Sequence, residues 1–198
     1  GSVSQSVASV EFTTDRVPAT LPYTCGFEDA VENNGWVLLN GTQTNTWYIG
    51  TAAYNSGANG LYITNDNGTS NAYDNASTSY VYAYRTINVE NASDYTVSFN
   101  WKANAESCCD YIRAFLVPAD ITINANGANG IGTTGAPANW IAIDGGSKLN
   151  NVSSWQTVSN VFSIEDAGNY NLVFYWKNDF STGSNPPAAI DNVSVIEV

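Results

Sequence analysis

The sequence contains no histidine, and this absence excludes several kinds of site at once. A Ser-His-Asp triad, a Cys-His pair and any zinc site with histidine ligands all need an imidazole. The chain has 3 cysteines, which are too few for a four-cysteine zinc site. For catalysis, paired carboxylates or an unusual nucleophile are what is left.

Basic residues are scarce as well: 6 Lys and Arg stand against 18 Asp and Glu, and the formal net charge is −12. Such an acidic surface repels phosphate backbones, so we expect no nucleic-acid partner. No apolar run approaches the roughly 18 residues of a membrane-spanning helix, so we expect no membrane insertion. The acidity suits a divalent cation bound by oxygen ligands, although solubility alone also accounts for many surface acids.

What the chain does contain is Asn, Ser, Thr and Gly, together with 6 Trp, 12 Tyr and 7 Phe. Charged residues make up only 12% of it. This composition is typical of an extracellular all-β module with polar strand faces and turn-rich loops. The chain opens with Gly1-Ser2 and shows no signal peptide. We therefore expect part of a longer multidomain protein that is secreted or displayed on a cell surface.

Alternating hydrophobicity predicts that most of the chain is β-strand. In 94–102 and 170–177, large apolar residues occupy every second position. Further strands are predicted at 36–39, 46–49, 60–64, 80–89, 111–117, 140–143, 155–164 and 189–197, with turn-forming Gly, Asn, Asp and Pro clusters between many of them. About ten strands with such connections predict an all-β, two-sheet antiparallel β-sandwich over 21–198. Residues 1–20 are predicted to be a linker or a peripheral segment.

The cysteines allow more than one interpretation. Cys108 and Cys109 are adjacent, and Cys25 is distant from both. An odd number leaves at least one thiol unpaired within the chain. The sequence fits small buried side chains, and it also fits a bridge from Cys25 to the pair in an oxidising compartment.

Asp191 occupies a position where a carboxylate is unexpected. In the last predicted strand it shares its parity with Val193 and Val195, so its side chain points toward the core unless a bulge intervenes. A buried carboxylate must be paired, hydrogen-bonded or bound to a metal. Glu28, beside Phe27 in the first core strand, would meet Asp191 if the first and last strands are neighbours. One cation would then relieve the repulsion of the two carboxylates, and the alternative is two unrelated surface acids.

The order of short motifs resembles the jelly-roll family that includes MAM domains and the bacterial cleaved-adhesin and choice-of-anchor J modules. The shared features are an early Phe27-Glu28, then Trp36, and a late Ile190-Asp191-Asn192-Val193. The bacterial branch is the more similar one, on the segments TWYIG at 46–50, LYITNDNG at 61–68, SYVYAYR at 79–85 and ESCCDYIRAFLVP at 106–118. The paired cysteines of the eukaryotic branch are not reproduced. The resemblance runs from about Leu21 to Val198.

This resemblance implies a jelly roll with a structural calcium ion. Its ligands carry over to Glu28 and Asp191, and the NDN segment offers Asp66 as a third, acidic ligand. The resemblance also implies a non-catalytic module for binding or adhesion. The expected partner is a glycan or a host or cell-surface protein.

Four aromatic residues are candidates for holding such a ligand: Trp47, Tyr48, Tyr73 and Trp140, which lie beside turns or opposite core positions. Exposed flat rings bind sugar rings by apolar stacking. The alternative is that these rings are core residues or cross-strand pairs.

Two other functions stay open at this point. A glycoside hydrolase would need two carboxylates, and Glu106, Asp110, Asp144 and Asp179 are the candidates. A passive spacer within a larger surface protein would need no ligand at all.

Overall fold

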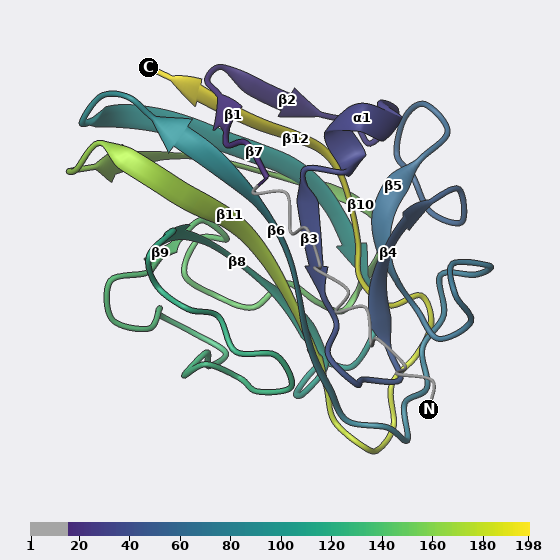
Figure 1. Cartoon of the computed structure of the whole chain (residues 1–198). Helices are drawn as coiled ribbons and strands as arrows, with labels where there is room; N and C mark the ends of the chain where they lie inside the picture. Colours follow the sequence, from purple (N-terminus) through teal and green to yellow (C-terminus); the bar gives the residue numbers. More distant parts are fainter. Residues whose placement is uncertain (1–15) are drawn as a thin grey trace, which may run out of the picture.

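Two β-sheets packed face to face form the molecule, as a computed structural model that describes residues 16–198 shows (Figure 1). The first sheet contains β1 (Ala19–Thr20), β3 (Trp36–Leu39), β6 (Ser79–Val89), β8 (Tyr111–Pro118), β9 (Ile141–Ala142) and β11 (Gly168–Asn178). The second contains β2 (Tyr23–Cys25), β4 (Thr46–Gly50), β5 (Gly60–Thr64), β7 (Ser93–Ala103), β10 (Val152–Ile164) and β12 (Ala189–Glu197). The predicted two-sheet sandwich is confirmed.

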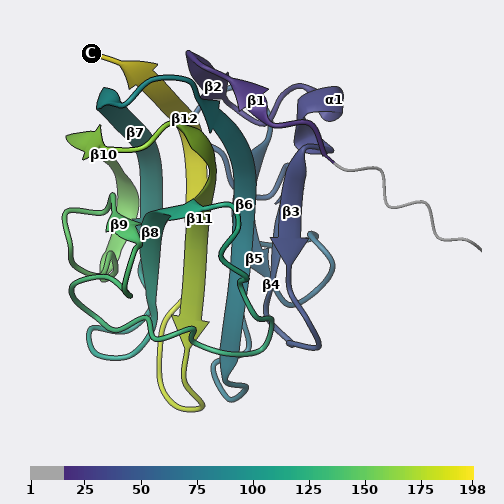
Figure 2. The same ribbon diagram turned by 60° about the vertical axis from the view of Figure 1, so that its left-hand side comes forward.

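The strand order explains how distant parts of the chain become neighbours. In the first sheet the order is β1-β6-β11-β8-β9, with β3 also paired to β6, and Figure 2 shows β8, β11, β6 and β3 side by side. In the second sheet it is β10-β7-β12-β5-β4, with β2 paired to β12. The first and last strands of the second sheet in chain order therefore lie side by side, as the sequence predicted for Glu28 and Asp191.

The predicted strands all occur, and the differences concern short elements. The strand expected at 140–143 is reduced to β9, and β1 lies inside 1–20, the part predicted to be a linker or a peripheral segment. A single helical turn, α1 (Ala30–Asn33), was not predicted; Asp29 caps its N-terminus by accepting from two backbone N–H groups. No helix within residues 16–198 is long and apolar enough to cross a membrane.

The main core fills the space between the two sheets. Every second side chain of β7 and β11 points into it, and the rings of Phe99 and Phe174 meet edge to face at 5.0 Å between centroids. Trp36 stacks near Phe174 and also contacts Phe27, just after β2. Cys25 is buried here with a free thiol, so it does not bridge to the adjacent cysteine pair.

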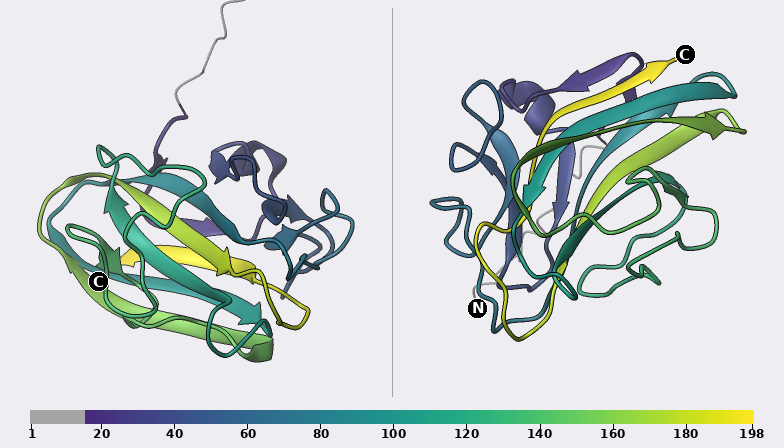
Figure 3. Two further views of the ribbon diagram at one scale, coloured as in Figure 1. Left: turned by 90° about the horizontal axis from the view of Figure 1, so that it is seen from below. Right: turned by 180° about the vertical axis from the view of Figure 1, so that it is seen from behind.

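A second apolar cluster lies on the opposite side of the first sheet. The long connection between β8 and β10, residues 119–151, folds over that face (Figure 3). Its Ile131 and Trp140 pack with Phe115 and Tyr175 of the sheet. Arg113 reinforces the cover, because its guanidinium pairs with a carboxylate at position 144 and donates to two carbonyls of the connection. This part of the first sheet is therefore closed to ligands.

Candidate functional site

Asp191 lies at a β-bulge in β12, and the bulge reverses the direction of its side chain. Ile190 and Val193 both face the core although they are three positions apart. In a regular strand, only residues an even number of positions apart share a face. The pairing of β12 with β7 shifts register between Asp191 and Ser194, and Asn192 has a φ of 51°. The expected parity with the core valines is therefore wrong. Asp191 faces outward from the second sheet.

The side chain of Asp191 is nevertheless completely buried, at 0% exposure, because the segment 51–59 between β4 and β5 covers it. Its Oδ2 accepts hydrogen bonds from the backbone N–H groups of Asn55 at 2.7 Å and Ser56 at 3.0 Å. Its Oδ1 accepts one from the N–H of Asn192 at 2.7 Å. Backbone donors thus satisfy this buried carboxylate.

Glu28 reaches the same segment from the end of β2. Its Oε1 accepts from the backbone N–H groups of Ala58 and Asn59, each at 2.8 Å, and its Oε2 accepts from the Asn59 side chain at 3.1 Å. The two backbone bonds lower the pKa of Glu28 below its usual value. Unlike Asp191, Glu28 is exposed. The structure therefore brings the two predicted metal ligands to one short segment, which each carboxylate holds by main-chain donors.

Asp66 is placed elsewhere. It follows the far end of β5, and the five-residue strand separates it from segment 51–59 by about 13 Å. Its carboxylate accepts from the Ser70 hydroxyl at 2.6 Å, the Thr64 hydroxyl at 2.6 Å and the Ser70 N–H at 2.9 Å. These bonds, that of the Ser70 hydroxyl foremost, lower the pKa of Asp66 to about 2. Calcium–oxygen distances are only about 2.3–2.6 Å, so one ion cannot join Asp66 to the other two acids.

The carboxylates of Glu28 and Asp191 each keep some free acceptor capacity. An ionised carboxylate has about four acceptor sites, and the hydrogen bonds above use three on each residue. Within residues 16–198, the two salt bridges are Arg85–Glu32 and Arg113–Asp144, so no basic side chain neutralises either carboxylate. Oxygen ligands of this kind are those that calcium prefers.

Three of the four aromatic residues predicted to bind a ligand are buried. Trp47 is 1% exposed and donates its ring N–H to the carbonyl of Val81. Tyr73 is 6% exposed and donates its hydroxyl to a buried aspartate. Trp140, at 8% exposure, closes on Phe115 in the second apolar cluster. Their rings are core residues and are not available for stacking on a sugar.

Tyr48 differs from these three because its ring is 40% exposed on the outer face of the second sheet. It is paired in register with Tyr62, and the two ring centroids are 6.0 Å apart. Segment 51–59 folds back over Tyr62, against which Ala53 packs. Close approach of this segment requires Gly60, since a Cβ there would lie 2.3 Å from the carbonyl oxygen of Ala53. Tyr62 is thereby covered.

The same segment exposes a further ring, Tyr54, at 45%. Across the sheet, Ala189 continues the row of Tyr48 and Tyr62, and Lys102 comes next. The Lys102 ammonium lies 5.1 Å from the ring centroid of Trp155, which packs against the same small cluster from β10. We call Tyr48, Tyr54, Lys102 and Trp155 the second-sheet patch.

Sequence reasoning missed three members of the second-sheet patch. The predicted strands 94–102 and 155–164 contain Lys102 and Trp155. No pattern in the sequence showed that these residues and Tyr54 would lie around one surface, because β10, β7 and the β4–β5 segment meet only through the strand order of the second sheet.

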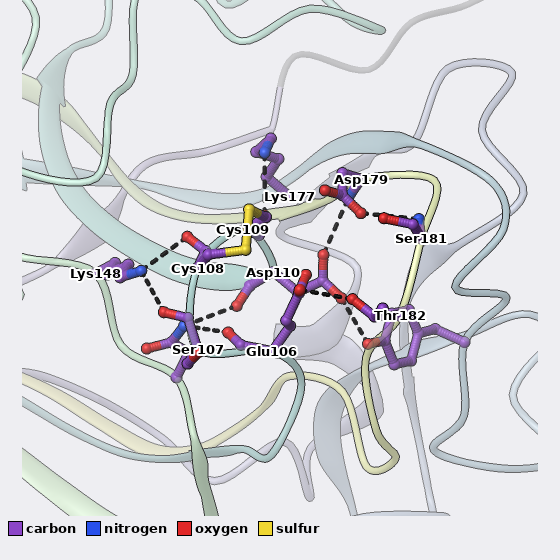
Figure 4. The surroundings of a disulfide bond; sticks show 12 residues. Glu106, Ser107, Cys108, Cys109, Asp110, Lys148, Lys177, Asp179, Ser181 and Thr182 are labelled. Atoms are coloured by element: carbon purple, nitrogen blue, oxygen red, sulfur yellow. Dashed lines mark hydrogen bonds between the residues drawn. A yellow bond between two sulfur atoms is a disulfide. The ribbon is translucent and has the colours of Figure 1, made fainter.

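The adjacent cysteines form a disulfide in the turn between β7 and β8 (Figure 4). Two lysines fix this turn through its carbonyl oxygens. Lys148 donates to those of Ser107 at 2.6 Å and Cys108 at 2.8 Å, and Lys177 donates to that of Cys109 at 3.0 Å. Both ammonium groups are thus bound to backbone and leave the neighbouring acids without a basic partner.

Those acids are the carboxylates considered for glycoside hydrolysis. Oxygens of Glu106, Asp110 and Asp179 lie within 4.8 Å of one another. Asp110 is 1% exposed and accepts from the Tyr73 hydroxyl and the Asp179 N–H, and burial raises its pKa. Asp144 is buried in its ion pair with an arginine. A catalytic pair must flank the glycosidic bond, and burial withdraws Asp110 and Asp144 from one, whereas Glu106 and Asp179 are only partly buried.

The chain was compared with known proteins in sequence and in structure. No protein-family model matches the chain, and no curated protein matches it in sequence. The structure is similar to the CBM22-1 xylan-binding domain from Paenibacillus barcinonensis Xyn10C, with a TM-score of 0.52 and 13% identity over 92% of this chain and 97% of that one.

Two other structures are also similar. The enzymatically active domain of tailspike protein 4 of bacteriophage CBA120 gives a TM-score of 0.52 and 13% identity, over 87% of this chain and 20% of that one. The family 11 carbohydrate-binding module from Clostridium thermocellum, in complex with a mixed-linked tetrasaccharide, gives 0.48 and 14%, over 88% and 94%. At these identities the similarity concerns the fold, which is a jelly-roll β-sandwich.

Proposed function

We propose that this chain is a non-catalytic carbohydrate-binding module whose ligand lies on the second-sheet patch. The observation that carries the proposal is the pair of exposed rings, Tyr48 on the outer face of the second sheet and Tyr54 on segment 51–59, which covers part of that face. Residues 119–151 cover the part of the outer face of the first sheet that carries Phe115 and Tyr175, so those rings are closed to a ligand, whereas Tyr48 and Tyr54 are open to one. The jelly roll shared with a xylan-binding domain supports the same function, although a shared fold does not by itself define a ligand.

Binding to soluble polysaccharides tests this proposal. Affinity electrophoresis against xylan and mixed-linkage β-glucan, followed by calorimetry with oligosaccharides, should detect a glycan ligand. Tyr48→Ala and Tyr54→Ala should each weaken binding roughly tenfold, since a stacked ring contributes about 1–2 kcal/mol. Phe180→Ala is the matched control, because Phe180 is an exposed ring, at 72%, outside the patch. If both tyrosine variants bind as tightly as the wild type, the patch is not the site.

We also propose that a structural calcium ion binds at Glu28 and Asp191. Two carboxylates without a basic partner support this, as does the resemblance to MAM-like, cleaved-adhesin and choice-of-anchor J modules. The ion would join the end of β2 to β12 and neutralise charge next to segment 51–59. At calcium 100-fold above its dissociation constant, such an ion adds about 2.7 kcal/mol to the free energy of unfolding.

Thermal unfolding in EDTA and in added calcium tests the ion. EDTA should lower the melting temperature and calcium should restore it, and Glu28→Gln should remove most of this response. A melting temperature that is identical in EDTA and in calcium, after prolonged dialysis, would exclude a stabilising ion.

The setting of the module belongs to the same proposal. We place it in a longer secreted or cell-surface protein, where it would attach the remainder to a glycan. A host or cell-surface protein is the alternative ligand, and a passive spacer is the alternative without one. Failure of every glycan to bind the correctly folded wild type would favour these alternatives over the carbohydrate-binding module.

A further inference from the structure

Lys102 differs from every other basic residue of the chain. Five of the six Lys and Arg side chains make hydrogen bonds or ion pairs: Arg16 to a backbone carbonyl, Arg85 and Arg113 to carboxylates, and Lys148 and Lys177 to carbonyls of the disulfide turn. Within residues 16–198, the Lys102 ammonium makes neither; its partner is the ring of Trp155. It is therefore the one basic side chain in this part of the chain whose charged group has no hydrogen-bond or ion-pair partner in the protein.

The position of Lys102 links this cation to the proposed glycan surface. Lys102 pairs in register with Ala189, Ala189 with Tyr62, and Tyr62 with Tyr48. Three strand spacings separate Lys102 from Tyr48, or about 14 Å. A glycan chain that stacks on Tyr48 and extends across the strands would pass over segment 51–59, which covers Tyr62, and place a further sugar over Trp155, next to the ammonium. The span far exceeds the width of one sugar ring.

The positive charge of Lys102 indicates which chemical group the bound sugar carries. Lys102 is half-buried, and burial lowers its pKa because it removes water from the ammonium. A bound anion would stabilise the charged ammonium. With a net charge of −12, however, the protein as a whole repels densely charged polymers. One free ammonium beside an aromatic ring, on an acidic protein, complements one carboxylate on an otherwise neutral chain.

We infer that Lys102 selects a glycan with a neutral backbone that carries isolated uronic acid groups, by donating hydrogen bonds to the uronate carboxylate while a neighbouring sugar stacks on Trp155. The inference rests on the proposed glycan-binding function and adds the ligand class. Lys102 is a specificity residue in this proposal; the tyrosines of the second-sheet patch supply binding that does not depend on the carboxylate.

A matched pair of ligands tests the inference. The first is a xylan oligosaccharide that bears one glucuronic acid, and the second is the same oligosaccharide with that carboxyl group reduced to the alcohol. Calorimetry at low salt should show about tenfold tighter binding of the acid form by the wild type, as a charged hydrogen bond provides. The preference should shrink at high salt, because the ion pair is partly exposed.

Variants assign this preference to Lys102. Lys102→Gln and Lys102→Met should bind both oligosaccharides with the affinity that the wild type has for the reduced form, and Lys102→Arg should keep most of the preference. Lys148→Gln changes the net charge equally at the disulfide turn and should leave the preference intact. Thermal melts confirm that each variant is folded, and Met keeps a long apolar stem while it removes the charge.

The outcomes separate the two proposals. Equal affinity of the wild type for both forms, or a preference that survives in Lys102→Gln and Lys102→Met, would refute the role of Lys102 while glycan binding itself stands. If neither oligosaccharide nor any other glycan binds, the carbohydrate-binding function fails and the inference fails with it.

Discussion

Replacing Asp191 by Asn tests the fully buried carboxylate that holds segment 51–59. The change preserves the size of the side chain and removes its charge. In the native protein the carboxylate is fully buried and accepts three backbone N–H groups, those of Asn55, Ser56 and Asn192. All three partners are donors, so a side-chain amide can satisfy only part of this arrangement.

The cost follows from the geometry of these bonds. If the Asn carbonyl faces Asn55 and Ser56, its NH₂ group faces the N–H of Asn192, which then has no acceptor. An unsatisfied buried donor costs about 1–3 kcal/mol, and two bonds that change from charged to neutral lose about 1 kcal/mol each. We therefore expect Asp191→Asn to lower the free energy of unfolding by about 3–5 kcal/mol. Typical domains have only about 5–15 kcal/mol in total.

Urea unfolding at neutral pH, in EDTA and again in calcium, measures this cost. Asp166→Asn is the matched control, because the same chemical change on an exposed acid should stay within about 0.5 kcal/mol. A loss below about 1 kcal/mol in EDTA would refute the reasoning from backbone donors. A loss that occurs only in calcium would show that the ion, and not the backbone, satisfies Asp191.

Three further predictions concern other parts of the molecule. The pKa of Asp66 is lowered to about 2, so the carboxylate stabilises the protein above the ordinary value near 3.8, and this stabilisation is lost as pH falls toward 2. Asp66→Asn should therefore make the melting temperature fall less steeply with pH in that range, and an unchanged slope would contradict this. Trp140→Ala should destabilise the protein by about 3–5 kcal/mol in urea unfolding, because it leaves a cavity in the second apolar cluster, and it should leave glycan affinity unchanged. A loss of binding without a loss of stability would show that Trp140 is a ligand residue. Alkylation of the folded protein should label no cysteine before reduction, and Cys108 and Cys109 after it; labelling of Cys25 would contradict its burial. Reduction should lower the free energy of unfolding by only about 1 kcal/mol, since the loop that the disulfide closes is minimal.

The strands were predictable because their signal is local. Large residues at every second position of β7 and β11 define a buried face whatever the rest of the chain does, and this was enough for the two-sheet sandwich. The same logic failed at Asp191, where a bulge adds one residue to β12. A bulge is set by the pairing with the neighbouring strand, and the apolar pattern before and after it does not reveal the shift.

For the aromatic residues too, the sequence pattern predicted the face of the strand but not whether that face is covered. In β4, alternation places Trp47 and Tyr48 on opposite faces, but it does not say which face is covered. Trp140 and Tyr73 looked like surface rings because they lie near turns; the connection 119–151 and the β7–β8 turn bury them. Covering by a loop depends on contacts between segments that are far apart in sequence, which periodicity does not encode.

By itself, the sequence determined that this protein is an acidic, all-β chain without histidine chemistry, and it left open whether Glu28 and Asp191 meet or are two unrelated surface acids. Only the tertiary structure decided that both carboxylates hold segment 51–59, that three expected binding rings are core, and that Lys102, beside Trp155, shares the outer face of the second sheet with Tyr48. The physical reason is range: residue type and alternation act over a few positions, whereas burial and strand register are fixed by the packing of the whole chain.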